Sequence, residues 1–477
     1  GIKMKSKTKG LPHIYALVFI FMVIMALLTW VLPSGQYTRK DVTIGSSTKS
    51  VPVDGTYAQM DKIGEDGKDV RQGLFGLFVA PTEGVQKSAD VVAFVLIVGG
   101  AFQIINSTGA IMTGMKAIVR KLGKFNILVI PISMILFGLG GTTFGMAEEL
   151  LPFYMIFIPL LFSMGYDSMT TFLVVFLGSS VGVMASTVNP FSVIIAQGIA
   201  GIVGNPQLGF RCVQFIILEA LAILFTVLYA RRVKKNPESS ITFATDMEWK
   251  KELVEQDAGK TDGTMTNRQK LVIVIFTVCF IIIIYNLVVN GWYMDEMCAV
   301  FLMMGIFSGI AGGLSMNEMA CEFVNGMKDF VYAGLIIGIS RGILCIAENG
   351  MIIDTILYSL VSVLRSVPLW FYTTAMYLVE VVFSIFVPTT SGVAALTMPV
   401  LAPLTEFLGF NPEGAVTCYQ YACKLTLMLS PAAPVTVAGI AMCRLTFQQW
   451  WKTIWKFVLL MLAVTIGFAI ISSRLPM

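Results

Sequence analysis

Two stretches of the sequence decide the fold. They are Gly141-Thr-Thr-Phe-Gly-Met-Ala-Glu-Glu-Leu-Leu-Pro152 and Val387-Pro-Thr-Thr-Ser-Gly-Val-Ala-Ala-Leu-Thr-Met-Pro399. Each lies inside an apolar stretch, 126–162 or 369–408, that is too long for one membrane helix. Gly, Thr and Pro interrupt both stretches in the middle. We expect each stretch to form a helical hairpin with Thr-Thr and Gly at its turn.

These hairpins belong to an internal repeat. Four residues of the first stretch recur with the same spacing in the second: Thr142, Thr143, Gly145 and Pro152 match Thr389, Thr390, Gly392 and Pro399. The order continues on both sides, since Gly84, Gly109, Gly165-Tyr-Asp and Ser186-Thr-Val-Asn-Pro190 match Gly326, Gly350, Gly409-Phe-Asn and Ser430-Pro-Ala-Ala-Pro434. A repeat of this kind is typical of membrane carriers. It predicts two halves, 1–230 and 269–477, joined by a linker, 231–268.

Composition places the chain in a membrane. Of its 477 residues, 56% are hydrophobic and 13% are charged, whereas a soluble chain carries roughly 25% charged residues. Beyond the hairpins, the candidate spans are 14–33, 91–111, 169–203, 210–230, 270–290, 297–313, 331–349, 415–443 and 454–473. We expect an all-α polytopic protein with about nine or ten crossings. The polar segments 34–90 and 231–268 are expected to be loops, and the first span a retained signal anchor after four lysines, Lys3, Lys5, Lys7 and Lys9.

Several classes of function are excluded. The net charge of +4 is too small and too dispersed for nucleic-acid binding. The eight cysteines lie almost all in apolar segments without a CxxC pair, which indicates buried apolar residues rather than disulfides or a metal site. His13 is the single histidine, so a His-based metal site or catalytic triad cannot be built, and no GxxxxGK[ST] run offers an ATP site. We expect a small-molecule substrate and lipid as partners, and no metal, cofactor or catalytic residue.

Lys and Arg residues predict the orientation, because cytoplasmic loops carry them in excess. With the N-terminus in the cytoplasm, the basic residues fall inside: Lys116, Arg120, Lys121, Lys124, Arg231, Arg232, Lys234, Lys235, Arg444, Lys452 and Lys456. The outside loops around Asn205, Trp292 and Asn411 carry none. This holds only if 126–162 enters and leaves on the cytoplasmic side and 369–408 on the outer side. The charges therefore require two re-entrant hairpins of opposite orientation.

Polar residues at the turns and in two interrupted spans are candidates for substrate binding. A re-entrant turn frees backbone groups that Thr or Ser hydroxyls or a ligand can satisfy. The turn candidates are Thr142, Thr143, Gly145, Thr389, Thr390, Ser391 and Gly392. Ser186, Asn189 and Ser430 interrupt the spans 169–203 and 415–443 together with prolines, a pattern typical of discontinuous helices whose ends point partial charges inward. The alternatives are turn chemistry alone and a proline kink without a ligand.

Glu148 and Glu149 follow the first turn directly. A carboxylate within the membrane is costly unless paired or solvated, so the pair is a functional candidate for a cationic ligand or for proton handling. The second half has Ala395 and Leu396 instead, which favours a role in binding one substrate over a role in the scaffold. The alternative is that the glutamates cap their hairpin.

Four further charged residues lie in apolar spans. Lys424 precedes Ser430 in the second interrupted span and can replace a coupling sodium ion as a fixed cation, or form an ion pair with Glu380. Arg341 can meet a substrate carboxylate, or pair with Glu348 on the same helix face.

The chain resembles the YfcC/ArcD family, which is grouped with the anaerobic C4-dicarboxylate carriers in the ion transporter superfamily. The resemblance rests on Gly145-Met-Ala-Glu-Glu-Leu-Leu-Pro-Phe-Tyr154, Gly165-Tyr-Asp, Asn189-Pro-Phe and Ile195-Ala-Gln-Gly-Ile-Ala-Gly201, and on Pro12-His-Ile-Tyr15 with Trp30-Val-Leu-Pro-Ser-Gly-Gln-Tyr37. It covers nearly the whole chain. It implies an elevator-type carrier, usually a homodimer, with a scaffold and a transport domain that holds both hairpins. We expect the scaffold to comprise 14–33, 210–230, 270–290, 297–313 and 454–473.

Family members include arginine–ornithine exchangers and proteins named as dicarboxylate carriers. We expect a secondary carrier of the bacterial inner membrane that exchanges basic amino acids such as arginine or ornithine, because paired glutamates repel a dianion but hold a guanidinium or ammonium. The alternatives are an ion-coupled carrier of a C4-dicarboxylate or another small carboxylate, and a channel.

Overall fold

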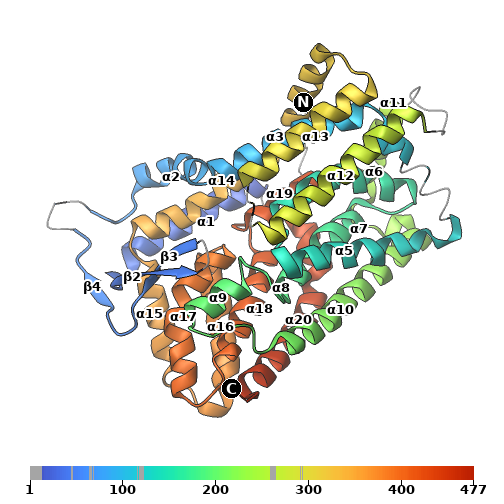
Figure 1. Ribbon diagram of the computed structural model, residues 1–477. Coiled ribbons are helices and arrows are strands. Elements are labelled where there is room, and N and C mark those ends of the chain that lie inside the picture. Colours follow the sequence, from blue (N-terminus) through green and yellow to red (C-terminus); the bar gives the residue numbers. More distant parts are fainter. Residues whose placement is uncertain are drawn as a thin grey trace.

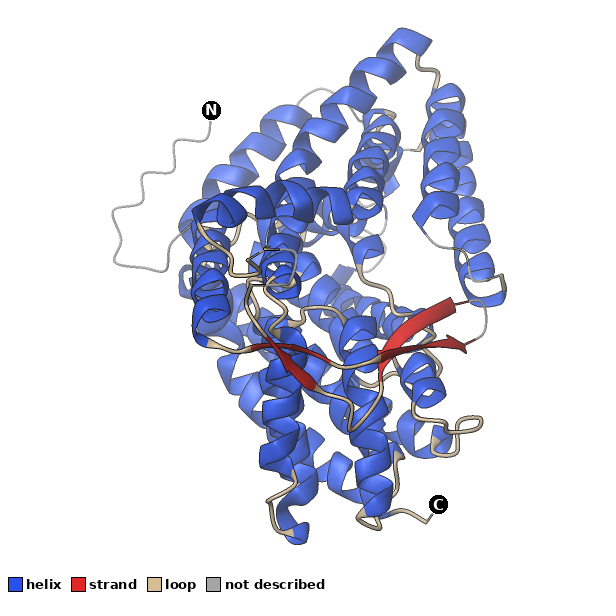
Figure 2. Cartoon of the chain, turned by 90° about the vertical axis from the view of Figure 1, so that its left-hand side faces the viewer, coloured by secondary structure: helices blue, strands red, loops and turns tan. Residues whose placement is uncertain are grey.

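Helices make up nearly all of the computed structural model, which describes residues 13–44, 47–63, 67, 69–114, 117, 123–257, 265–290, 292 and 294–476. The four N-terminal lysines lie outside this described part. So do Lys116, Arg120 and Lys121, which were among the basic residues used above for orientation. The molecule is a helical body with four short strands across one side (Figures 1 and 2).

The first half contains the four strands and the first hairpin. Its elements are α1 (Ile14–Val31), β1 (Ser34–Gln36), β2 (Arg39–Ile44), β3 (Ser47–Pro52), β4 (Ala58–Met60), α2 (Leu74–Lys87), α3 (Ala89–Ser107), η1 (Gly123–Leu128), α5 (Val129–Phe144), η2 (Glu148–Leu150), α6 (Leu151–Ser163), α7 (Ser168–Phe172), the π-helix η3 (Leu173–Leu177), α8 (Gly178–Met184), α9 (Val193–Ile199) and α10 (Leu208–Lys235).

After α10, every secondary-structure element in the described part of the chain is a helix. Its elements are η4 (Pro237–Ser239), α11 (Phe243–Asp257), α12 (Asn267–Val289), α13 (Met294–Gly312), α14 (Met316–Asn349), α15 (Ile353–Leu364), η5 (Leu369–Phe371), α16 (Tyr372–Phe386), α17 (Thr390–Phe407), α18 (Glu413–Leu429), α19 (Pro434–Met442) and α20 (Phe447–Arg474).

Eight helical segments of the described chain are long and apolar enough to cross a membrane. They are Ala89–Ser107, Asn126–Phe144, Leu208–Lys235, Asp295–Gly312, Phe330–Asn349, Leu369–Phe386, Glu413–Met442 and Phe447–Arg474. Tyr15–Val31 and Ser168–Met184 are shorter apolar helices at two further predicted spans. The protein is therefore a multi-pass membrane protein.

The segment 34–90 is more ordered than the sequence predicts. It was expected to be a loop, but β1 pairs with β4, β2 pairs with β3, and α2 begins within the segment. Arg39 at the start of β2 forms an ion pair with buried Asp354 of α15 at 2.7 Å, which fixes the strands to the helical body. The expected linker 231–268 likewise contains α11, and its residues 258–264 lie outside the described part.

One group of helices packs around α14. α14 lies along α1, α2 and α3, and α13 packs on α3 and α12 (Figure 1). Glycines allow the close approach of α14 to its neighbours. A Cβ on Gly84 of α2 would lie 2.4 Å from Gly338 O, and one on Gly326 of α14 would lie 2.4 Å from Gly99 O of α3.

The other group, called here the hairpin unit, comprises α5–α10 and α16–α20. α5 packs on α8 and α10, and α16 packs on α18 and α20, while α6 contacts α19 and α17 contacts α9. The expectation that 210–230 and 454–473 belong to a scaffold with the α14 group is therefore wrong at the level of packing. Buried faces of α10 and α20 lie against the hairpin helices.

Each hairpin has both of its ends at one end of the hairpin unit. Lys234 Nζ bonds Asn126 Oδ1 at 2.8 Å and lies 5.0 Å from the ring centroid of Tyr166, so the residues before α5 and after α6 meet at the Lys234 end. At the Ser473 end, Thr373 of α16 bonds Ser473 Oγ at 3.0 Å, and Asn411 after α17 donates to Ser473 O at 2.9 Å.

α10 and α20 connect these two ends in opposite directions. α10 starts beside the Ser473 end, where Gln207 donates to Ser472 O at 2.9 Å, and finishes at Lys234. α20 starts beside Ile241, whose carbonyl accepts from Gln449 at 3.0 Å just after the end of α10, and finishes at the Ser473 end. The two hairpins therefore open toward opposite ends of the unit.

Contact between α5 and α8 offers a direct test of this packing. A Cβ on Gly182 would lie 2.2 Å from Gly138 O, whereas a Cβ on Gly209 of α10 would have nothing within 4 Å. Alanine favours a helix over glycine by about 1 kcal/mol, so only the clash can destabilise. We expect Gly182→Ala to lower the melting temperature of the purified protein and Gly209→Ala to leave it unchanged or raised. Equal melting temperatures for the two variants would contradict the α5–α8 contact.

Candidate functional site

The first hairpin turn is bonded to the break between α8 and α9. Gly145 ends α5 with φ 77°, a left-handed conformation that favours glycine. Buried Thr142 donates through Oγ1 to Ala185 O at 2.7 Å and accepts from Thr187 N at 3.0 Å. Thr143 donates to Leu139 O at 2.6 Å within its own helix. These hydroxyls satisfy the backbone that the turn and the break leave free.

Asn189 and Ser186 hold the break itself. Ser186 Oγ donates to Val183 O at 2.6 Å and accepts from Asn189 Nδ2 at 3.1 Å, while Asn189 Oδ1 accepts from Phe191 N at 2.8 Å. The Asn189 side chain also lies against Gly145, where a Cβ would come within 2.8 Å of it. Thr142, Gly145, Ser186 and Asn189 are thus brought together at the break, and Ser186 and Asn189 bond each other.

A buried network of hydrogen bonds and one ion pair links this break to the second half of the chain. Gln420 of α18 donates to Ser186 O at 3.1 Å and accepts from Arg211 of α10 at 2.7 Å. Arg211 forms an ion pair with Glu413, whose other oxygen accepts from Gln197 at 2.6 Å. A break in a membrane helix needs such internal partners.

The second hairpin turn leaves its hydroxyls free within the described part of the chain. Thr389, Thr390 and Ser391 are half-buried at the start of α17, and none of their side chains makes a hydrogen bond to a described residue. Gly392 lies directly over Thr389, because a Cβ there would be 2.3 Å from Thr389 Oγ1. Tyr419 of α18 donates to Thr390 O at 2.9 Å and thereby fixes the turn.

Two tryptophans cap the other break. Trp450 and Trp451 of α20 donate to the last carbonyls of α18, Met428 O at 2.8 Å and Leu429 O at 3.2 Å. Ser430, the predicted candidate, is buried and accepts from Ala432 N at 3.1 Å. At both breaks, protein groups therefore take the place of water and donate to the last carbonyls of the helix before the break.

Glu148, Glu149 and Lys424 lie in one region between the first turn and α18. Glu149 accepts from Ala147 N at 2.8 Å, and Glu148 interacts electrostatically with Glu149 and with Lys424. Both carboxylates are half-buried, and the Lys424 side chain is buried without a hydrogen bond or ion pair to a described residue. This leaves two acids and one base without a close salt bridge, beside the turn.

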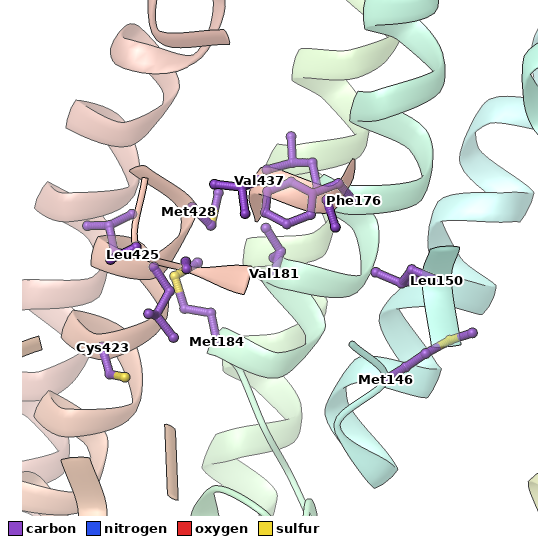
Figure 3. Close-up of a cluster of buried hydrophobic side chains, with 14 of the residues drawn as sticks. Met146, Leu150, Phe176, Val181, Met184, Cys423, Leu425, Met428 and Val437 are labelled. Carbon is purple, nitrogen blue, oxygen red and sulfur yellow. The ribbon is translucent and has the colours of Figure 1, made fainter. Parts of the chain in front are cut away.

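Buried apolar side chains of the core lie beside the first turn. Figure 3 shows Met146 and Leu150 of the first turn beside Phe176, Val181 and Met184, with Leu425, Met428 and Val437 across from them. Ser179 Oγ also donates to Met146 O at 2.5 Å. The turn is therefore seated on η3 and α8 by both apolar and polar contacts.

Two of the alternative ion pairs are wrong. Glu348 bonds Lys87 of α2 at 2.9 Å instead of Arg341, because α14 packs along α2 at this point. Glu380 forms no pair with Lys424, and both of its carboxylate oxygens are buried without a hydrogen-bond partner among the described residues. No hydrogen bond or ion pair in the described chain joins Arg341 to either turn.

The sequence interpretation missed the residues that position the breaks. They are Gln197, Arg211, Glu413, Tyr419, Gln420, Trp450 and Trp451. The available signal was the presence of Arg211 and Glu413 within apolar segments, because an ionisable residue there needs a partner. The glutamines and aromatic residues gave no signal.

The two hairpins open toward opposite ends of the unit and pack with two broken helices. Hairpins and broken helices with polar groups at their turns are typical of secondary transporters of the membrane. The chain belongs to the C4-dicarboxylate anaerobic carrier family (DcuC), whose model matches residues 11–473. It is 33% identical to the "putative basic amino acid antiporter YfcC" of Escherichia coli, over 93% of this chain and 92% of that protein.

Further similarity covers almost the whole chain. An uncharacterized protein of Haemophilus influenzae is 28% identical over 95% of both chains. Among solved structures, the YdaH transporter of Alcanivorax borkumensis is 13% identical, with a TM-score of 0.42, over 97% of this chain and 98% of that one.

The Arg211–Glu413 pair gives a second test. Arg211→Met leaves Glu413 buried and unpaired, which costs about 3–5 kcal/mol. We expect a large drop in melting temperature for this variant, and a partial recovery for Arg211→Met combined with Glu413→Leu, which removes both charges. A single variant that melts at the wild-type temperature would contradict the buried pair.

Proposed function

We propose that the chain is an elevator-type exchanger of basic amino acids with two re-entrant hairpins. The contacts of the hairpin ends support re-entrance: those of the first meet at Lys234, and those of the second at Ser473. The length of α6 agrees, whereas the first arms Asn126–Phe144 and Leu369–Phe386 are long enough to cross. α6 has 13 residues, so it is about 20 Å long against a hydrocarbon core of about 30 Å.

Reciprocal contacts support the division into two inverted halves, 1–230 and 269–477. Gly84 and Gly326 are the matching residues of the repeat, and Gly84 packs on Gly338 and Gly342 while Gly326 packs on Gly99 and Gly100. α5 with α8 and α6 with α19 are likewise mirrored by α16 with α18 and α17 with α9. Such exchanged contacts are what a pseudo-two-fold axis produces.

The division of the helices into two groups, which meet where α19 lies against α14, supports an elevator. The hairpin unit carries both turns and both breaks, and the α14 group forms the proposed scaffold. Glu148 interacts electrostatically with Asp90 at the start of α3, so the charged region faces this group. The proposal is that the hairpin unit moves past the α14 group with its substrate.

Charge supports the orientation with the Lys234 end in the cytoplasm. Arg231, Arg232, Lys234 and Lys235 end α10, and Lys452 lies near the start of α20, which is at the same end. Cytoplasmic loops carry such basic clusters. A bacterial inner membrane and a homodimer complete the proposal, the homodimer resting on the family resemblance alone.

The single observation that carries the substrate proposal is the Glu148–Glu149 pair beside the first turn. Its two carboxylates exceed the one cation of Lys424, so a guanidinium or ammonium group would balance the region. Hydroxyls of Thr389, Thr390 and Ser391 at the start of α17 can receive the α-carboxylate, since a helix N-terminus favours an anion. The name of the Escherichia coli relative points to the same substrate class.

A C4-dicarboxylate is the second candidate, and its supporting observation is different. Lys424 lies buried without an ion pair to a described residue. A substrate carboxylate would form an ion pair with its ammonium group. The family description names this substrate class. Its weakness is the repulsion between a dianion and the Glu148–Glu149 pair.

The third prediction separates the two substrate classes. We expect arginine, ornithine or lysine to raise the melting temperature of the purified protein, and fumarate or succinate to have no effect. Glu148→Gln and Glu149→Gln should abolish this stabilisation and reduce arginine counterflow in vesicles by about tenfold or more, because each hydrogen-bonded charge contributes ~1.5–3 kcal/mol. Their melting temperatures without substrate should stay near that of the wild type.

Glu406→Gln is the matched control, because Glu406 is exposed at the far end of α17. It should bind and exchange normally. Stabilisation by dicarboxylates only would reject the basic amino acid proposal. Normal exchange by both glutamate variants would assign the pair to capping the hairpin.

The fourth prediction concerns Lys424 and the driving ion. An uncompensated charge at mid-membrane costs roughly 2.5–3.5 kcal/mol, so the empty unit crosses poorly and the loaded unit crosses well. Lys424 supplies a fixed cation, and we expect sodium-independent exchange. Lys424→Ala should impair counterflow or make it depend on sodium, while Lys452→Ala at the exposed start of α20 should not. Strictly sodium-driven uptake by the wild type into vesicles free of internal substrate would refute this prediction.

A further inference from the structure

Glu380 is a buried acid that the proposed exchange does not use. It lies on α16, its side chain is fully buried, and neither carboxylate oxygen has a hydrogen-bond partner among the described residues. Ser384, one turn further along α16, is buried in the same way and its hydroxyl also has no partner there. An ionised carboxylate in such surroundings would cost several kcal/mol. A proton bound to Glu380 would remove this cost.

The neighbours of Glu380 suit an acid rather than a carboxylate. Thr397 of α17 lies beside it, and the Thr397 hydroxyl already donates to Val393 O at 3.0 Å. That oxygen can only accept a further hydrogen bond. A protonated Glu380 can donate to it, whereas Thr397 can donate to an ionised Glu380 only by giving up its bond to Val393 O.

No cation stands close to Glu380 among the described residues. The titratable groups that interact with it from α18 are Cys418, Tyr419 and Cys423. Lys424 interacts instead with Glu148 and Cys423. On α15, the carboxylate of Asp354 forms an ion pair with Arg39. Thiols are poor ligands for a hard ion such as sodium, so the surroundings favour a proton over a metal ion.

Side chains with hydroxyl groups lie on both sides of this acid along one face of α16. Thr373, Tyr377, Glu380 and Ser384 follow one another at three- or four-residue steps, so they share one face of α16. Thr373 bonds Ser473 at 3.0 Å, and Tyr377 bonds Thr465 of α20 at 2.8 Å. All four side chains of this line are buried. The line runs from the Ser473 end, past Glu380, to the last turn of α16 before Thr389.

We propose that Glu380 is a proton-binding site of the second hairpin, served by this hydroxyl line, and that it couples translocation to a proton gradient. Loading forms one O–H bond on the carboxylate and release breaks it, with no transfer of electrons. The proton enters along Thr373 and Tyr377 from the Ser473 end, and the hairpin unit crosses the membrane with Glu380 protonated. The proton leaves past Ser384 toward the turn at Thr389 once that turn faces the opposite side. This rests on the proposed movement of the hairpin unit, but not on which substrate it carries.

Glu219 is the rival candidate for the same role. It lies on α10, buried, and both of its oxygens also lack a partner among the described residues. Its carboxylate sits against Gly138 of α5, where a Cβ would approach within 2.8 Å. No line of bonded hydroxyls like that of α16 leads to it among the described residues. Glu219→Gln is therefore the matched comparison for Glu380→Gln.

The test uses purified full-length protein in vesicles whose membrane potential is clamped with potassium and valinomycin. Counterflow of arginine at equal pH measures the proposed exchange. Net uptake into arginine-free vesicles under an imposed pH gradient, with a pH dye inside, measures coupling. We expect the wild type to show fast counterflow and a slower net uptake, limited by the return of the empty unit, that is severalfold above net uptake at equal pH. A sodium gradient added at equal pH, with the potassium clamp kept, should give no stimulation.

Glu380→Gln should keep counterflow and lose the effect of the pH gradient together with the dye signal. Glu380→Asp should keep coupling with a displaced pH profile, and it serves if the glutamine variant fails to fold. Ser384→Ala should weaken coupling, and Glu219→Gln should retain it. The proposal is overturned if Glu380→Gln stays pH-driven, if Glu219→Gln alone loses coupling, or if sodium replaces the proton. A wild type that exchanges without pH-driven uptake overturns only this inference, whereas one without counterflow refutes the proposed exchange.

Discussion

The carbonyl groups at the break between α8 and α9 are the constraint on which the rest of the structure depends. A helix that stops inside an apolar interior exposes carbonyls that no water can satisfy. Here Ala185 O accepts from Thr142, Ser186 O from Gln420, and Thr187 O from Asn205. One donor lies in the first hairpin and another in the second half of the chain. The break can therefore persist only while the first turn and α18 stay packed around it.

The architecture could be predicted because its causes are local. Gly and Thr in the middle of a long apolar stretch predict a turn, and the repetition of that pattern predicts a second one. The turns of α5–α6 and α16–α17 fall where Thr-Thr and Gly occur. α2 was missed because Pro81, Glu83 and Lys87 dilute its apolar residues, and the strands of 34–60 were missed because short polar strands carry little pattern.

The partners of the candidate residues could not be predicted, because they depend on which helices become neighbours. Arg341 and Glu348 share a helix face, yet α2 brings Lys87 to Glu348. Glu380 and Lys424 lie on α16 and α18, which pack together, but Lys424 interacts electrostatically with Cys423 and Glu148. Spacing along one helix restricts which residues can meet, whereas packing between helices decides which of them do.

The two hairpin turns differ in their free hydrogen-bonding groups and in their charge. Thr142 and Thr143 bond protein carbonyls, so the first turn is closed, whereas the hydroxyls at the start of α17 have no partner in the described chain. The acids Glu148 and Glu149 lie only beside the first turn. A symmetric dianion would need two equivalent positive ends, which this arrangement does not offer. An amino acid with a cationic side chain has two ends of opposite charge, and each would meet a different turn. The proposed inverted repeat would supply two matching turns, and the differences between the turns would supply the proposed selectivity.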